Sequence, residues 1–168
     1  TGGEAAGDVL VNVEGVLGTS LHDKLTGDAG NNILDGADGN DTLNGGAGAD
    51  TITGGSGIDA VDYSGSATGV TINLGAGTGV GGDADGDVFV TVENLIGSGE
   101  ADSLTGSASA NVLEGGAGDD TLIGAVGADT LTGGTGLDTA SYATSAIAVT
   151  VSLATGTGSG GDAQGDVI

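Results

Sequence analysis

Residues 27–62 read GDAGNNILD, GADGNDTLN, GGAGADTIT and GGSGIDAVD, which are four consecutive rows of nine residues without a gap. Glycine holds the first and fourth positions of each row, aspartate or asparagine the sixth, and a large aliphatic residue the eighth. These positions are Gly27, Gly36, Gly45 and Gly54; Gly30, Gly39, Gly48 and Gly57; Asn32, Asp41, Asp50 and Asp59; and Leu34, Leu43, Ile52 and Val61. The pattern G-G-x-G-x-D-x-U-x, kept over four rows, predicts a repeated structural unit.

The chemistry of one row predicts how it folds. Only the eighth position must be apolar, so positions seven to nine form a very short strand with one side chain pointing inward. The glycines allow positive φ, so that the first six positions reverse the chain tightly. A carboxylate at position six beside exposed carbonyls makes an oxygen-only site, which suits hard cations such as Ca²⁺. A disordered Gly/Asp-rich linker is disfavoured, because it would not keep an aliphatic residue in nine-residue phase.

These rows resemble the RTX, or haemolysin-type, calcium-binding nonapeptide repeats of secreted bacterial proteins. The resemblance implies an all-β fold: a parallel β-roll, or β-solenoid, in which successive rows lie on alternate sides and two rows make one coil. It also implies that each Ca²⁺ lies between the turns of rows n and n+2, held by sixth-position carboxylates and backbone carbonyls. Type I secretion of the unfolded chain is a further implication of the resemblance.

The composition narrows the possible functions. The 168 residues include 39 glycines, only three aromatic residues, and no proline, cysteine, methionine or tryptophan, which predicts a thin aliphatic core without helices or disulfides. The formal net charge is −23, with Lys24 as the single basic residue. This charge excludes nucleic acid as a partner and disfavours anionic membranes. Membrane insertion is not expected, because the chain has no long apolar run. Bound Ca²⁺ would relieve the repulsion among the acidic residues.

A longer period lies over the rows, because Asp8 recurs as Asp87 and again as Asp166, and Tyr63 recurs as Tyr142, always at the same offset. The chain therefore reads as a tandem array of two full 79-residue units and the start of a third. We assign 1–17 to the end of a preceding insert, 18–62 to a first row block, 63–96 to an insert, 97–141 to a second block, and 142–168 to the next insert.

In the insert 63–96, Val70, Ile72 and Leu74 lie at alternate positions, as do Val88, Val90 and Val92, which predicts two strands. They flank a Gly-rich loop over 75–87. We expect the insert to continue the coil with longer strands and a protruding loop. The alternative is a small β cap that interrupts the roll.

Pairing rows n and n+2 gives candidate sites of about three Ca²⁺ ions per unit. The pairs are Asp23 with Asp41, Asn32 with Asp50, Asp41 with Asp59, Asp102 with Asp120, Asn111 with Asp129, and Asp120 with Asp138. The further candidate ligands from the turns are Gly36, Asp38, Gly39, Gly45, Gly48, Gly54, Gly57, Gly115, Gly118, Gly124, Gly127, Gly133 and Gly136. The alternative role of the aspartates is to cap turns through Asx-type hydrogen bonds. Sites at rows with asparagine or missing glycines should be weaker.

Two further features have less specific interpretations. Asp83, Asp85 and Asp87 alternate in the insert loop, which indicates either an additional Ca²⁺ site or a solvated acidic turn. His22 is the only histidine and fits a surface position. Catalysis is not expected, since acids on nearly every turn form pairs without catalytic meaning.

The sequence thus predicts a secreted or bacterial cell-surface module that folds on calcium binding. Its role would be structural: a spacer, adhesin stalk, surface-layer or filament segment, with end-to-end contacts to other copies. The competing hypothesis is an accessory module of a secreted protease, lipase or polysaccharide-modifying enzyme. An ice-binding β-roll is a minor alternative, because the file of threonines at position seven is interrupted.

Overall fold

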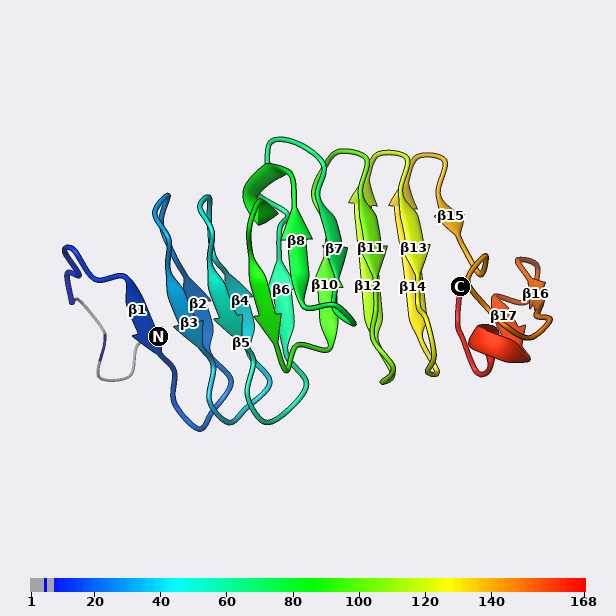
Figure 1. The fold of residues 1–168 in the computed structure, drawn as a ribbon, viewed down its shortest axis with the longest axis horizontal. Helices are drawn as coiled ribbons and strands as arrows, with labels where there is room; N and C mark the ends of the chain where they lie inside the picture. Colours follow the sequence, from blue (N-terminus) through cyan, green and yellow to red (C-terminus); the bar gives the residue numbers. More distant parts are fainter. Residues whose placement is uncertain (1–4, 6–7) are drawn as a thin grey trace.

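The computed structural model describes residues 5 and 8–168, so residues 1–4, 6 and 7 of the expected segment 1–17 lie outside the described residues. The chain winds from one end of an elongated body to the other, alternating between two facing sheets (Figure 1). In order across the first sheet, called sheet A, lie β1 (Gly15–Leu17), β3 (Ile33–Asp35), β5 (Thr51–Thr53), β9 (Val88–Val90), β8 (Thr78–Val80), β7 (Thr71–Asn73), β11 (Ser103–Thr105), β13 (Thr121–Ile123) and β15 (Thr139–Ala140). Sheet B contains β14 (Thr130–Thr135), β12 (Val112–Ala117), β10 (Asn94–Ile96), β6 (Ala60–Asp62), β4 (Thr42–Asn44) and β2 (Lys24–Thr26).

Each coil of the row blocks contains two rows, as predicted. Each strand pairs in parallel with the strand two rows further along the chain: Leu25 lies beside Leu43, and Leu34 beside Ile52. Consecutive rows therefore fall in opposite sheets. The prediction of an all-β parallel β-roll is confirmed.

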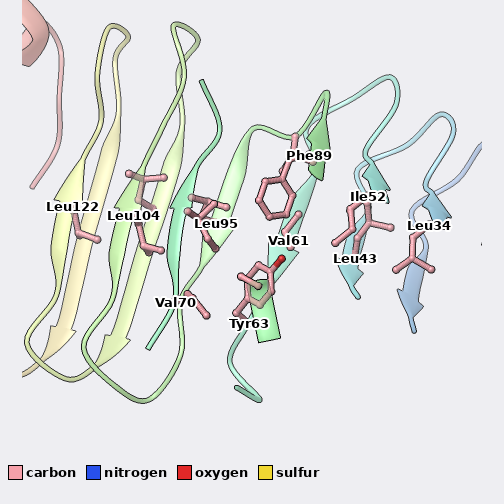
Figure 2. Packing of buried hydrophobic residues seen from close by; sticks show 14 of the residues in the cluster. Leu34, Leu43, Ile52, Val61, Tyr63, Val70, Phe89, Leu95, Leu104 and Leu122 are labelled. Atoms are coloured by element: carbon pink, nitrogen blue, oxygen red, sulfur yellow. The ribbon is translucent and has the colours of Figure 1, made fainter. Parts of the chain in front are cut away.

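The core is one file of eighth-position side chains from each sheet, meeting in the space between them. Leu43, Ile52, Val61 and Leu113 are each 0 % exposed, although every strand around them is short. Burial of one such side chain contributes about 1.5–3 kcal/mol, so stability accumulates coil by coil. Figure 2 shows this file interrupted in the middle of the molecule by the rings of Tyr63 and Phe89, which meet edge to face.

The insert enters sheet A as a hairpin. β7 and β8 pair in antiparallel fashion, β8 pairs in the same way with β9, and β9 returns to run parallel to β5. The expected longer strands are wrong: β7 and β9 have three residues each, because β5 and β11 beside them present only three-residue edges. The expected protruding loop 75–87 instead contains β8 and a single 3₁₀ turn, η1 (Gly82–Ala84), whose Ala84 is fully buried.

The second insert repeats this arrangement in the opposite sheet. β16 (Thr150–Ser152), β17 (Thr157–Ser159) and η2 (Gly161–Ala163) are the equivalents, one unit later, of β7, β8 and η1. Val167, the equivalent of Val88, forms a parallel bridge with Thr130 of β14 in sheet B. Val88 itself pairs in parallel with Thr51 of β5 in sheet A. In Figure 1, η1 accordingly lies at the upper edge of the molecule and η2 near the lower edge. Within the described residues no helix is long and apolar enough to span a membrane.

Candidate metal-binding turns

The turns between the two sheets stack along two edges of the molecule, and within each row block the sixth-position side chains of each edge form a ladder. In this ladder Oδ1 of one residue accepts the backbone N–H of the sixth-position residue one coil earlier. All six predicted pairs are joined in this way: Asp23 to Asp41, Asn32 to Asp50, Asp41 to Asp59, Asp102 to Asp120, Asn111 to Asp129, and Asp120 to Asp138, with N···O distances of 2.7–3.1 Å.

The second carboxylate oxygen separates the rows into two classes. In four rows the side chain also accepts the backbone N–H of position two, which closes the turn with an Asx-type hydrogen bond; the donors are Thr19, Asp28, Ser98 and Ser107 and the acceptors Asp23, Asn32, Asp102 and Asn111. In Asp23 and Asp102 this bond is accepted by Oδ2, and in Asn32 and Asn111 it is accepted by the amide Oδ1. The capping alternative therefore holds for these four turns, which we call closed turns.

The remaining buried aspartates leave that oxygen free. Oδ2 of Asp41, Asp50, Asp59, Asp120 and Asp129 is buried and has no hydrogen-bond partner among the described residues. Their turns, which we call open turns, have Ala37, Gly46, Gly55, Gly116 and Ala125 at position two, all with positive φ. This conformation turns the position-two N–H away from the carboxylate; Gly46, for example, donates to Asn44 at 2.9 Å. A buried, unpaired carboxylate oxygen costs several kcal/mol in isolation, so these five atoms call for a ligand.

The first-position glycines keep open the space in front of these oxygens. A Cβ built on Gly36 would collide with Oδ2 of Asp41 and with the carbonyl oxygen of Gly54, one coil further on. A Cβ on Gly115 would meet Asp120 and the carbonyl of Gly133 in the same way. The turns at Gly36 and Gly115 thus each direct a carboxylate oxygen and a backbone carbonyl of the following coil into one small cradle that only glycine permits.

The fourth-position glycines serve the same turns from the other side. Gly39 has φ +138° and lies against the carbonyl of Leu21, one coil earlier. Among the other predicted fourth-position glycines, Gly48, Gly57, Gly118, Gly127 and Gly136 also have positive φ. Gly54 lines a cradle like that of Gly36, whereas the three atoms nearest a Cβ on Gly45, Gly124 or Gly133 all belong to the aspartate of the same row. Asp38 and Asp138 are exposed.

Burial raises the pKa of the carboxyls of Asp50, Asp59, Asp120 and Asp129. Desolvation is the main cause at Asp50, Asp59 and Asp120, where nearby carboxylates add to it and a backbone hydrogen bond opposes it. At Asp129 burial, with the charge of Asp166, raises the pKa to about 6. The folded chain therefore holds these carboxylates in a site that favours a positive counter-charge.

The donor set fits a hard cation. It consists of carboxylate and carbonyl oxygens without sulfur or nitrogen, which are the ligands that Ca²⁺ takes. No group of three or more acidic, histidine or cysteine side chains comes together in residues 5 and 8–168, so a cation here would depend on backbone carbonyls for most of its ligands. A bound ion would supply a positive charge to the unpaired Oδ2 atoms of the open turns. The chain itself contributes the buried carboxylates and the open space in front of them.

Of the two interpretations of the acidic insert loop, an additional Ca²⁺ site is not supported by a cluster, because Asp83, Asp85 and Asp87 do not come together in the structure. Asp85 accepts the N–H of Gly81 at 3.3 Å and staples the loop, as Gln164 does for Gly160 in the second insert. Asp87 instead lies 1 % exposed in the interior, away from that turn, and Asp83 lies within η1. His22 is exposed and accepts the N–H of Asn40 through Nδ1.

The ladder roles of three residues, Asp87, Glu93 and Asp166, were not predicted from the sequence; Asp166 accepts the N–H of Asp129 at 3.0 Å. Asp87 accepts the N–H of Asp50 at 2.8 Å, and Glu93 accepts that of Asp59 at 3.0 Å, so both stand where sixth-position residues stand elsewhere. The signal was present: residues 82–90 have glycine at position one, Asp87 at six and Phe89 at eight, and Glu93 precedes Leu95 in phase with the row at Gly97.

Comparison with known proteins agrees with this geometry. The family model described as RTX calcium-binding nonapeptide repeat matches four times, at residues 17–52, 26–61, 92–122 and 105–140, which together span more than half of the chain. No curated protein matches the chain. The chain belongs to the family of RTX calcium-binding nonapeptide repeat proteins.

Proposed function

We propose that the chain is an extracellular structural module that folds by binding Ca²⁺ in its open turns. The observation that carries the proposal is the set of five buried carboxylate oxygens without partners among the described residues, each facing a glycine cradle. The proposed ligands are the side chains of the six ladder pairs and the carbonyls of the first- and fourth-position glycines. About three ions would bind per unit, with the open turns stronger than the closed ones.

Calcium binding would provide the free energy for folding that the metal-free chain does not have. The net charge of −23 opposes compaction, and the aliphatic core is only two side chains thick. Binding free energy then appears as folding free energy. Affinities of about 10⁻⁴ to 10⁻³ M, as in extracellular modules, would leave the chain unfolded at cytosolic calcium and folded after export. This behaviour suits a spacer, stalk, surface-layer or filament segment of a secreted or cell-surface protein.

Circular dichroism tests the coupling directly. The chain is measured in EGTA, after addition of calcium, and after addition of magnesium at the same ionic strength. We expect β-structure to form with calcium and not with magnesium, which requires a smaller, more regular oxygen shell. Full β-structure in EGTA would contradict the proposal.

The proposal extends to end-to-end association. A cavity of about 510 Å³ at the C-terminal face is lined by Tyr142, Val149, Val151 and Ile168, among others. The equivalents of these four residues one unit earlier are Tyr63, Val70, Ile72 and Phe89, which are buried in the core together with the side chains of β10 and β11. Within residues 8–168 no equivalents of β10 and β11 cover this surface, so either the next unit of a longer chain or a second copy would supply them.

Those missing strands exist at the other end of the chain. The equivalents of β10 and β11 are β1 and β2, whose Val16 and Leu25 are only partly buried. A second copy can therefore place β1 beside β15 and continue the coil, because β10 pairs with β6 inside the molecule, and β1 and β15 are the equivalents of these two strands. Such a contact repeats without closing.

Sedimentation velocity tests this contact. At saturating calcium the chain should show concentration-dependent assembly that Leu25→Glu abolishes. Leu21→Glu, an exposed position in the preceding turn, is the control and should leave assembly unchanged. A strictly monomeric wild-type chain would contradict this contact and leave calcium-coupled folding unaffected.

A further inference from the structure

Tyr63 lies at the first position of a nine-residue row, which is glycine in the rows of both row blocks. It follows Gly54 by nine residues, and its N–H donates to the carbonyl of Ile96 at 2.9 Å, just as the first-position Gly36 donates to Thr53. The backbone of Tyr63 is thus that of a row start. Its side chain, however, is 2 % exposed and fills the space between the sheets beside Phe89 (Figure 2).

The hydroxyl of Tyr63 donates to Asp87, the ladder residue that follows Asp50 along the same edge. Oδ1 of Asp87 accepts the Asp50 N–H, as in the other ladder pairs, and Oδ2 accepts the tyrosine hydroxyl. Both oxygens of this buried carboxylate are therefore satisfied inside the protein. In the open turns, by contrast, the corresponding Oδ2 has no partner among the described residues.

The same arrangement occurs again one unit later on the opposite edge. Tyr142 donates to Oδ2 of Asp166 at 2.8 Å, and Oδ1 of Asp166 accepts the N–H of Asp129 at 3.0 Å. The cradles one coil before these two carboxylates also match: the three atoms nearest a Cβ on Gly45 all belong to Asp50, and those nearest a Cβ on Gly124 all belong to Asp129. At Gly36, the next coil's carbonyl is already among the nearest atoms.

We propose that in each unit a tyrosine hydroxyl takes the place of a calcium ion, so that Asp87 and Asp166 bind no metal and the ladder of ions is interrupted at the insert. The hydroxyl hydrogen supplies the positive end of a dipole to the oxygen that a cation would otherwise approach. The aromatic ring fills the space between the two sheets beside Phe89. This inference rests on the proposed function, because it specifies which ladder steps the ions occupy.

Two aspartate variants separate the inference from the proposed function. In Asp87→Asn the amide keeps an oxygen for the Asp50 N–H and can donate to the tyrosine oxygen. In Asp120→Asn, at an open turn, the charge facing the cradle is lost. Calcium binding is counted by equilibrium dialysis and titration calorimetry. We expect Asp87→Asn to bind as many ions as the wild type with a midpoint within about twofold, and Asp120→Asn to lose at least one ion per chain.

Loss of an ion in Asp87→Asn would overturn the inference while leaving the proposed function intact, provided that Asp120→Asn also loses one. Unchanged binding in both variants would instead overturn the proposed function and the inference with it. Tyr63→Phe adds an independent measurement, since it keeps the ring and removes only the hydroxyl. It should lower the melting temperature at saturating calcium by about 5 °C without changing the number of ions, and an unchanged melting temperature would overturn the inference.

Discussion

The substitution Asp120→Asn tests the open-turn geometry most directly. Asp120 is 1 % exposed; its Oδ1 accepts the N–H of Asp102 at 2.8 Å, and its Oδ2 has no partner among the described residues. Asparagine keeps the first hydrogen bond and presents an amide donor in place of the unpaired oxygen. The metal-free chain should therefore lose no stability, whereas two proposed sites, shared with Asp102 and Asp138, lose a charged ligand.

The magnitude follows from ligand linkage. With about 10 mM calcium and a site Kd of about 10⁻⁴ M, each site contributes about 2.7 kcal/mol to the free energy of unfolding. Loss of both sites would remove about 5 kcal/mol, a large fraction of the stability of a domain. Asp119→Asn is the matched control: Asp119 is the neighbouring residue and uses Oδ1 to accept the N–H of Leu137 in an exposed hydrogen bond, which the amide can still do.

Urea denaturation at saturating calcium, followed by circular dichroism, measures the difference between the two variants. Asp119→Asn removes the same charge and should stay within about 0.5 kcal/mol of the wild type. Asp23→Ala, in a closed turn, should also cost less than Asp120→Ala. Equal losses for Asp119→Asn and Asp120→Asn would refute the reasoning, because the effect would then come from net charge and not from the cradle.

Three further predictions follow from backbone strain, buried acids and core packing. Ala37 and Ala125 hold positive φ of 75° and 69°, so Ala37→Gly and Ala125→Gly should each stabilise the chain by about 1 kcal/mol in denaturation experiments, whereas Ala47→Gly, at an exposed position without this strain, should destabilise it slightly. The pKa values of Asp129 and Asp87, raised by burial to about 6, lie above the ordinary value of 3.8, so their contribution to metal-free stability is fully present below pH 3.8 and is lost as the pH rises through 6. The chain in EGTA should accordingly show more β-structure near pH 4 than at pH 7, and an opposite trend would contradict this assignment. Leu104→Ala should cost about 2–5 kcal/mol, since Leu104 is 0 % exposed, whereas Leu137→Ala, at 81 % exposure, should be nearly neutral by the same measurement.

The sequence predicts the row blocks well because each row encodes its own conformation. The aliphatic residue at position eight and the glycines around it fix strand, turn and phase locally, whereas the coil of two rows and the six ladder pairs were implied by the resemblance to the RTX repeats. The position of Leu43 between Leu25 and Val61 needs no information from elsewhere in the chain.

The insert could not be predicted in the same way, because its local sequence does not decide which of its strands pairs with β5. Both β7 and β9 carry apolar residues, and either could have paired with β5; β9 does so, and its hairpin brings Asp87 to the ladder. The predicted phase of Val88 and Val90 is wrong, because Phe89 between them is the side chain that is buried in the core. The same limit applies to the turns. Whether position two closes the turn on the carboxylate depends on its φ, and Ala37 and Ala125 adopt the value expected of glycine.

The alternation of the inserts between the two sheets has a mechanical consequence. Each insert adds two strands to one sheet only, and at about 4.8 Å per strand this makes that sheet about 10 Å longer than the facing one. The unequal lengths bend the axis of the molecule away from the longer sheet. If every unit had its added strands in the same sheet, the bends would add and an array of such units would curl. Because the hairpin of the first unit lies in sheet A and that of the second bridges to β14 of sheet B, successive bends oppose one another. A tandem array built on this unit would keep a straight mean axis with a shallow zigzag repeating every second unit, a geometry that transmits tension along its length without first having to uncoil.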